Sequence, residues 1–346
     1  MNHSTFKSFT FGIGLFFTLP LVYGNSSSPS SSDGTLYINK SKTHKVAPVK
    51  YGFHYEEIGM MGEGALHAEL IRNRSFEEAT PPAGLSVKNG LYENVPAPRV
   101  KEKKVFQADP LIGWTTYPLS YTPVFISRTD ENPMSGENKY SMLVNVTEDI
   151  ANHPDALILN RGYYGMNLKT DTSYRLSLFL KNRNYSAPLR VFLVDEWGQR
   201  VSNVIEVNVG NRDWTKYTGE LKPEKNVRRG MFAIQPMSKG QFQIDVVSLF
   251  PSDTWNDGKS VFRKDIVQNL KEFSPSFIRF PGGCIVHGVN EETMYRWKKT
   301  LGPIENRPGQ WSKWAPYYRT DGIGYHEFYE LCEYVGADAM LSLIHI

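Results

Sequence analysis

The stretch IVQNLKEFSPSFIRFPGGC, residues 266–284, decides the fold class of this chain. Apolar residues recur at helical spacing in its first half: Ile266, Val267, Leu270 and Phe273. Pro275 then stops the helix, and Phe277 to Phe280 follows as a short apolar strand before a Pro-Gly-Gly turn. A helix that leads into a buried strand indicates an α/β fold with a parallel sheet.

The same pattern repeats towards the C-terminus. A second helical face consists of Phe328, Leu331, Cys332 and Val335. Gly336 ends this helix, and residues 337–343 are predicted as the next strand. We therefore predict a (β/α)₈ TIM barrel in two parts, residues 35–78 and 247–340. Since such a barrel typically needs about 250 residues, we expect it to be truncated after about the third strand.

Residues 79–246 have a different pattern. One face of a strand consists of alternating apolar residues, Tyr174, Leu176, Leu178 and Leu180. Further strand-like runs are 157–159, 191–194, 204–209 and 242–247. Many short strands at close spacing predict a β-sandwich, inserted here into the α/β domain.

The N-terminus has the pattern of an export signal. Lys7 precedes a short apolar run from Phe9 to Leu21, and Gly24 offers a small residue for cleavage. The run is too short for a comfortable membrane span. We predict a signal peptide over 1–24, a Ser-rich linker over 25–34, and a secreted or periplasmic protein without a membrane anchor.

Charge and cysteine content exclude several classes of function. The net charge is +3, from 39 basic and 36 acidic residues, and without a basic cluster nothing indicates nucleic-acid binding. Cys284 and Cys332 are too few for a disulfide framework or a cysteine-based metal site, although the sequence leaves open whether they bridge. Aromatic residues make up 13%, which suits either stacking on sugars or a large β core.

The end of the predicted strand at Phe280 carries the sharpest functional signal. Arg279 can donate several hydrogen bonds to sugar hydroxyls or orient a catalytic carboxylate, or it can pair with a structural acid. Gly282 and Gly283 let the backbone approach a ligand closely, or simply make a tight turn. Cys284 either lines the pocket or is a small buried hydrophobe.

Glu56 and Glu57 end the first strand-like run. Because neighbouring residues on a strand point to opposite faces, these two cannot form the carboxylate pair that glycoside hydrolysis needs. One of them can bind a sugar hydroxyl, and a salt bridge is the alternative. We interpret His54 and His67 as ordinary polar residues.

Several motifs together resemble glycoside hydrolase family 51, the α-L-arabinofuranosidases. The N-terminal signature of that family is similar to residues 51–58 and 68–77, YGFHYEEI and AELIRNRSFE. Its inserted carbohydrate-binding-like sandwich resembles residues 160–166 and 174–177. Its second and third barrel segments resemble residues 277–288, Trp297 and GPIENRPG at 302–309. The resemblance extends from about residue 35 to 340 and keeps the order of the motifs.

The resemblance implies roles for five residues. Glu56 matches a glutamate that contacts the arabinofuranose, and Arg279 an arginine that supports the same pocket. Gly283 and Cys284 follow in the turn where the family contacts its substrate, and Trp297 matches a pocket wall. The family cleaves with retention through a covalent glycosyl-enzyme, and its two catalytic glutamates match no position here. No catalytic residue, metal site or organic cofactor is therefore expected in the chain.

The last six residues, 341–346, depart from the family pattern. They resemble the translation of a sequencing adapter, so we expect a non-native tail, with a genuine apolar strand as the alternative. The predicted parent enzyme is an exo-acting, retaining α-L-arabinofuranosidase acting on arabinose-containing polysaccharides or oligosaccharides, and we expect the fragment itself to be inactive. A non-catalytic carbohydrate-binding protein and a related glycosidase acting on another sugar are the rival interpretations.

Overall fold

The computed structural model describes residues 51–79, 109–288, 294–312 and 318–342, together with residues 39, 41 and 45. For residues 87–88, 91–93 and 105–107 it describes the backbone. The chain divides into the units Met1–Ala47 and Pro48–Ile346, and the second contains every helix and strand below. The predicted signal peptide, the linker, residues 35–38 at the start of the predicted barrel, and residues 343–346 lie outside the described residues.

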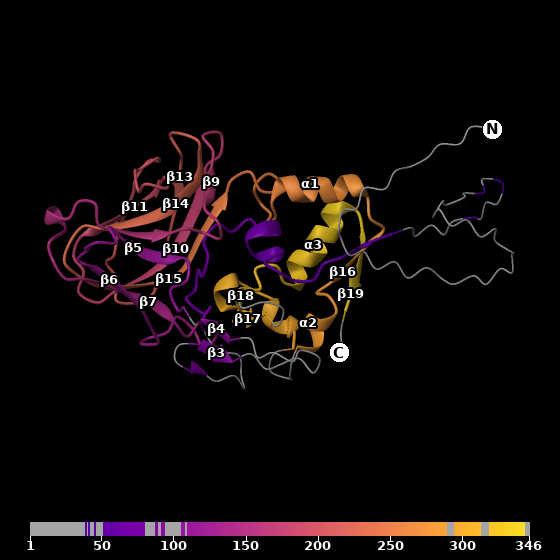
Figure 1. Cartoon of the computed structure of the whole chain (residues 1–346), viewed down its shortest axis with the longest axis horizontal. Helices are drawn as coiled ribbons and strands as arrows, with labels where there is room; N and C mark the ends of the chain where they lie inside the picture. Colours follow the sequence, from indigo (N-terminus) through magenta and orange to yellow (C-terminus); the bar gives the residue numbers. More distant parts are fainter. Residues whose placement is uncertain are drawn as a thin grey trace, which may run out of the picture. The chain divides into compact units, whose positions relative to one another are not determined.

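A parallel sheet organises the part of the chain in which α/β units are predicted. It contains β1 (Phe53–His54), β16 (Phe277–Phe280) and β19 (Asp338–Leu341), in the order β1-β16-β19. Phe53 pairs with Ile278, and Ile278 pairs with Ala339. Each parallel neighbour requires a crossover connection. Helix α1 (Lys264–Phe273) precedes β16 and α3 (Tyr325–Val335) precedes β19 (Figure 1).

Both predicted helices are confirmed. Helix α1 starts at Lys264, two residues before the predicted apolar face, and ends where Ser274 takes a left-handed conformation, with φ of 49°. The predicted apolar face of α3 is buried, and Gly336 ends this helix with φ of 77°. Helix α1 packs against α3, and α3 packs against β16 and β19. We call β1, β16, β19, α1 and α3 the parallel region.

Two antiparallel sheets occupy the part of the chain in which many strands are predicted. The five-stranded sheet has the order β13-β10-β15-β7-β6, and the six-stranded sheet β12-β11-β14-β8-β5. The bounds are β5 (Trp114–Tyr117), β6 (Val124–Thr129), β7 (Ser141–Val146), β8 (Leu157–Asn160), β9 (Met166–Leu168), β10 (Tyr174–Asn182), β11 (Pro188–Val194), β12 (Ile205–Asn208), β13 (Thr215–Leu221), β14 (Val227–Pro236) and β15 (Gly240–Pro251). We call these two sheets the paired sheets.

One buried apolar cluster takes side chains from both of these sheets. In β10, Tyr174, Leu176, Leu178 and Leu180 are buried while Arg175 is exposed, as the alternation predicts. Phe232 from the six-stranded sheet and Phe242 from the five-stranded sheet belong to the same cluster. Strand β15 continues to Pro251 with Val247 and Leu249 buried, so the predicted boundary at Val246 falls inside a strand.

The chain enters and leaves the paired sheets through adjacent segments. Arg263 N–H donates to the Leu66 carbonyl at 3.0 Å, and Ala68 N–H donates to the Val261 carbonyl at 2.8 Å. His67 and Phe262 form an antiparallel bridge between these two bonds. We call these two segments, 66–70 and 261–263, the neck.

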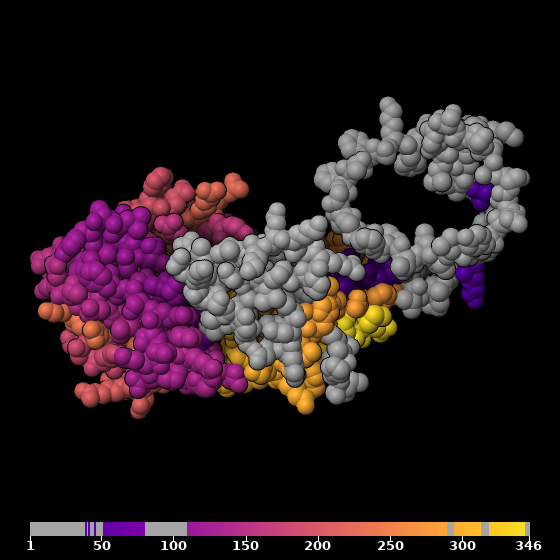
Figure 2. Space-filling model, turned by 60° about the horizontal axis from the view of Figure 1, so that its bottom comes forward, coloured from indigo at the N-terminus to yellow at the C-terminus, as the bar shows by residue number. Residues whose placement is uncertain are grey.

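Short elements complete the described chain. They are η1 (Gly62–Leu66), η2 (Ile150–Asn152), α2 (Cys284–His287), η3 (Trp297–Thr300), η4 (Ile304–Asn306) and the hairpin of β17 (Gln310–Trp311) with β18 (Tyr318–Arg319), besides the small sheet β2 (Val87–Lys88), β3 (Leu91–Glu93) and β4 (Val105–Gln107). Element η4 contacts the paired sheets, because the Asn138 side chain donates to the Glu305 carbonyl and Lys216 lies 3.2 Å from the Glu305 carboxylate. Figure 2 shows the magenta and orange surfaces adjoining in the lower half of the view.

Candidate functional site

The carboxyl ends of three parallel strands meet at one edge of the sheet. Residues 55–57 follow β1, residues 281–284 follow β16, and Ser342 follows β19. In barrels of parallel strands this edge carries the active site. Glu56 and Gly283, both predicted from the sequence as binding residues, follow within three residues of the ends of β1 and β16.

Glu56 is held by the turn that follows β16. Its carboxylate oxygen Oε1 accepts a hydrogen bond of 2.9 Å from the Ile285 backbone N–H, and its side chain is buried. Gly282 has φ of 126°, and a Cβ built there would lie 2.3 Å from Glu56 Cγ. A Cβ at Gly283 would lie 3.8 Å from Glu56 Oε2. The Pro-Gly-Gly turn therefore admits the Glu56 side chain only because position 282 lacks a side chain.

Arg279 stands on the face of the sheet that it shares with His54. The two residues are register partners in adjacent strands, and Arg279 Nε donates to Ser342 Oγ at 2.7 Å. His54 Nε2 lies 3.9 Å from Glu56 Oε2. Burial, followed by the charge of Arg279, lowers the pKa of His54 despite the opposing effect of Glu56. One carboxylate, one guanidinium and a neutral imidazole thus share this edge.

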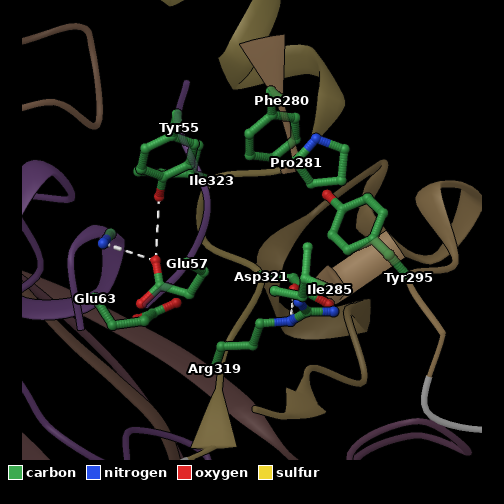
Figure 3. A pocket seen from close by; sticks show the side chains of 11 residues that line it. Tyr55, Glu57, Glu63, Phe280, Pro281, Ile285, Tyr295, Arg319, Asp321 and Ile323 are labelled. Atoms are coloured by element: carbon green, nitrogen blue, oxygen red, sulfur yellow. Dashed lines mark hydrogen bonds and ion pairs between the residues drawn. The ribbon is translucent and has the colours of Figure 1, made fainter. Parts of the chain in front are cut away.

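Glu57 points away from Glu56, as predicted for neighbouring residues. Its Oε2 accepts from the Gly62 N–H at 2.6 Å and from the Tyr55 hydroxyl at 3.1 Å, as Figure 3 shows. The cavity beside it, also bordered by Glu63 and Asp321, has a volume of about 20 Å³. That volume suits a single water molecule and is far below the several hundred Å³ of a typical ligand pocket. Glu57 therefore accepts hydrogen bonds inside the protein and does not line a ligand pocket.

Glu63 joins three parts of the chain beneath this edge. Its Oε1 accepts from the backbone N–H and the hydroxyl of Thr320, at 3.0 and 2.7 Å. Its Oε2 accepts from the Tyr163 hydroxyl of the paired sheets at 3.3 Å. Next to it, Arg319 Nε lies 2.9 Å from Asp321, whose pKa is raised by burial against the effect of Arg319. These buried charges fix the loop before α3 to both regions.

Arg307 and Glu327 form a second buried pair in that loop. Two guanidinium nitrogens donate to the two carboxylate oxygens at 3.0 and 2.7 Å. Burial opposes ionisation of Glu327, but the bonds from Arg307 lower its pKa overall. Arg307 also donates to the Asp321 carbonyl at 2.8 Å. The GPIENRPG motif is thereby anchored to the start of α3.

Trp297 belongs to a different group of side chains. Its ring stacks on Tyr325 at 5.6 Å between centroids, and Tyr325 stacks on Tyr295 at 5.8 Å. None of the contacts described for Trp297 involves Glu56. Cys284, by contrast, begins the short helix α2 directly after Gly283, and its thiol is free. Cys332 is also free and buried, which resolves the question of a bridge.

Sequence reasoning missed three groups that shape this site. The Ile285 N–H, which holds Glu56, is a backbone group and leaves no sequence signal. Ser342 lies in the stretch predicted as a non-native tail, yet it continues β19 and bonds to Arg279. The sequence gives no sign of the role of Glu63, because its partner Thr320 lies 257 residues away. Within the described residues, no cluster of His, Cys, Asp and Glu could hold a metal ion.

The chain is similar to several known proteins. The family model described as "Alpha-L-arabinofuranosidase 1 domain" matches residues 269–345. Alpha-L-arabinofuranosidase 1 of Arabidopsis thaliana is 29% identical over 292 residues, covering 83% of this chain and 39% of the relative. An extracellular exo-alpha-L-arabinofuranosidase of Streptomyces chartreusis is 27% identical, covering 83% and 31%.

A solved structure extends the likeness to the fold. The structure of arabinose-bound MgGH51 α-L-arabinofuranosidase matches with a TM-score of 0.70 and 25% identity, covering 88% of this chain and 45% of that chain. The chain thus spans less than half the length of these relatives. None of the helices in the described residues is long and apolar enough to cross a membrane. Over most of its length the chain is thus similar to α-L-arabinofuranosidases, including one of glycoside hydrolase family 51.

Proposed function

We propose that this chain supplies the arabinofuranose-binding edge of an exo-acting, retaining α-L-arabinofuranosidase. The substrates would be terminal arabinofuranosyl groups of arabinose-containing polysaccharides or oligosaccharides. The observation that carries the proposal is the Glu56 carboxylate, held by the Ile285 N–H at the carboxyl ends of β1 and β16. The names of the relatives support it across most of the chain.

The chemistry of this edge suits a sugar. The carboxylate oxygens of Glu56 are hydrogen-bond acceptors, so they suit the hydroxyl donors of a sugar ring. Arg279 offers donors to sugar oxygens from the neighbouring strand, and its bond to Ser342 fixes the guanidinium plane. Gly283 and Cys284 leave little side-chain bulk beside Glu56. In the proposed enzyme these residues bind and orient the substrate without attacking it.

The bond-breaking carboxylates are proposed to lie elsewhere in a longer protein. Retaining hydrolysis needs two carboxyl groups about 5–5.5 Å apart. Glu57, the nearest carboxylate in sequence to Glu56, points to Gly62 and Tyr55 instead. We therefore propose that the parallel region is the first part of a (β/α)₈ barrel, and that the 346-residue polypeptide alone is inactive.

Kinetics with an aryl α-L-arabinofuranoside test this function. In a longer protein that contains the chain, Glu56→Gln and Arg279→Ala should each lower kcat/KM about ten- to a hundredfold, since hydrogen bonds to charged groups contribute about 1.5–3 kcal/mol. Glu196→Gln, at an exposed carboxylate of the paired sheets, is the matched control and should leave turnover unchanged.

Two outcomes would contradict the proposal. Wild-type kinetics in a folded Arg279→Ala protein would remove Arg279 from the pocket. Turnover by the 346-residue polypeptide equal to that of the longer protein would refute the missing-carboxylate argument. If saccharides bind but are not hydrolysed by the longer protein either, a non-catalytic carbohydrate-binding protein is the better description.

We also propose that the protein is exported, with cleavage near Gly24. The pattern of Lys7 and the apolar run Phe9–Leu21 supports export, and one relative is described as extracellular. N-terminal sequencing of the mature protein tests it. An intact Met1 in a cytosolic fraction would show the proposal to be wrong.

A further inference from the structure

A second and larger groove lies between the paired sheets and the start of α1. Its volume is about 630 Å³, within the range of several hundred Å³ that small-molecule sites occupy. It is bordered by residues of the β9 segment, by the neck and by the first turn of α1, which lie in the upper part of Figure 1. None of its lining residues is Glu56, Arg279, Gly283 or Cys284. The groove is therefore separate from the proposed arabinofuranose site.

We propose that this groove binds a neutral saccharide. The first observation is the ring of Tyr164, which lines the groove and is 85% exposed. The turn that presents it is fixed by the bond from Gly165 N–H to the Arg161 carbonyl and by the left-handed Gly162 and Gly165. An exposed aromatic face on a fixed turn gives a sugar ring a stacking platform that needs little further ordering.

The second observation concerns buried polar atoms that border the groove. His67 and Thr254 are each 2% exposed, and among the described residues neither His67 Nδ1 nor Thr254 Oγ1 has a hydrogen-bond partner. The nearest carboxylate to His67 Nδ1, that of Glu63, is 3.9 Å away. Buried polar atoms in native proteins are normally paired, so an unpaired one indicates a missing ligand or water. A polyhydroxylated ligand supplies both donors and acceptors to such atoms.

The charge of the groove excludes strongly charged ligands. Three basic and three acidic side chains line it: Lys169, Arg263 and Lys264 against Glu69, Asp253 and Asp265. Arg263 and Asp265 bond to each other, with Nε donating to Oδ1 at 3.1 Å. A site for a phosphate or a polyanion would show an excess of cations instead. The balanced lining therefore favours a neutral ligand rich in hydroxyl groups.

Calorimetric titration of the full chain tests this groove, and it requires no turnover, so it is independent of the proposed function. The probes are a neutral arabinan oligosaccharide, a linear xylo-oligosaccharide and an anionic oligogalacturonide. Tyr164→Ala should weaken the binding of a neutral probe about two- to tenfold, since an aromatic contact contributes about 0.5–1.5 kcal/mol and 1.4 kcal/mol is tenfold. Thr254→Val should weaken it as well, at an unchanged melting temperature.

Two control variants separate the groove from other surfaces. Trp197→Ala removes another exposed aromatic residue that follows β11, 72% exposed, and should not change the affinity. Glu56→Gln should leave groove binding intact. Loss of binding in Glu56→Gln but not in Tyr164→Ala would assign the sugar to the edge site and overturn the proposal. No saturable binding by the wild type, or a preference for the anionic probe, would also overturn it.

Discussion

The paired sheets and the parallel region bury their apolar side chains in different ways. In the paired sheets, strands of up to 12 residues bury side chains in one shared cluster. In the parallel region, β1 has 2 residues and β16 has 4, and β19 is largely exposed, with Met340 at 45%. Its interior is instead an aromatic group around Phe280, which stacks on Tyr55 and Phe328. Strand pairing therefore determines the structure of the paired sheets, and packing of aromatic side chains determines that of the parallel region.

The regular strands and the proposed binding residues thus lie in different regions of the molecule. Among the residues proposed to bind arabinofuranose, Glu56 and Gly283 lie on irregular backbone after short strands, where the Gly282 turn and the Ile285 N–H set the position of Glu56. Binding residues are commonly carried by loops that a rigid scaffold positions. The long antiparallel strands contribute a regular body, and the turn after β8 presents Tyr164 to the groove that is proposed to bind a saccharide.

The largest expected effect tests whether the two regions unfold separately. Phe232 and Phe328 are both fully buried, in different clusters. Phe232→Ala and Phe328→Ala should each cost about 3–5 kcal/mol. Peptide-resolved hydrogen exchange should show loss of protection in β10 and β15 for the first variant, and in α3 for the second. Equal loss across both regions in either variant would mean that the molecule unfolds as one unit.

A pair of opposed pH effects is expected near the neck. Burial lowers the pKa of His67 from 6.5 to about 4 and raises the pKa of Glu78 from 4.5 to about 7. The unfolded chain protonates His67 below pH 6.5, so this residue's contribution is full above pH 6.5 and is lost as the pH falls to about 4. Glu78 behaves oppositely: its contribution is full below pH 4.5 and is lost as the pH rises to about 7.

Single variants should show how each residue changes the pH dependence of stability. Relative to the wild type, His67→Gln should lose stability as the pH rises across this window, and Glu78→Gln should gain it, each by on the order of 3 kcal/mol. Urea unfolding at several pH values measures both differences. Parallel stability curves for wild type and variants would contradict the assigned pKa directions.

A smaller effect is expected where η4 contacts the paired sheets. Asn138 is 1% exposed and donates to the Glu305 carbonyl. Asn138→Ala should cost about 0.5–1.5 kcal/mol, because the Glu305 carbonyl loses a hydrogen bond that it accepts. Hydrogen exchange of residues 301–307 should rise while β10 stays protected. Unchanged exchange in that loop would show that this bond does not hold the two regions together.

The smallest effect is expected at the surface of the same contact. Lys216 and Glu305 lie 3.2 Å apart, with the lysine side chain 46% exposed. Lys216→Met should change stability by at most about 1 kcal/mol, and less at high salt, because exposed ion pairs are screened. Thermal melts at low and high salt measure this. A salt-independent loss would indicate packing of the Lys216 stem on Phe179 rather than charge.

Regular elements could be predicted from the sequence because their signals are local. The alternation of Tyr174, Leu176, Leu178 and Leu180 and the helical face of α3 both report burial on one side. Glu56 and Glu57 bind different backbone groups, as expected for neighbours on an extended segment, although strand β1 ends at His54.

Contacts between distant segments could not be predicted in this way. Nothing local links Glu63 to Thr320 or Arg279 to Ser342, because these bonds depend on the order of strands in the sheet. The family resemblance implies that Trp297 is a pocket wall, and its ring, at the start of the short element η3, stacks on Tyr325. A single aromatic residue carries no period from which its direction can be inferred.

The neck has a consequence for how such a chain can change. A backbone hydrogen bond joins Leu66 and Arg263, so the segment between these two residues begins and ends at the same place in the fold. An inserted segment whose ends already touch adds little closure entropy to the host, whatever its length. The segment between the two sides of the neck could therefore change in length while the pairing of β1 with β16 stays in place.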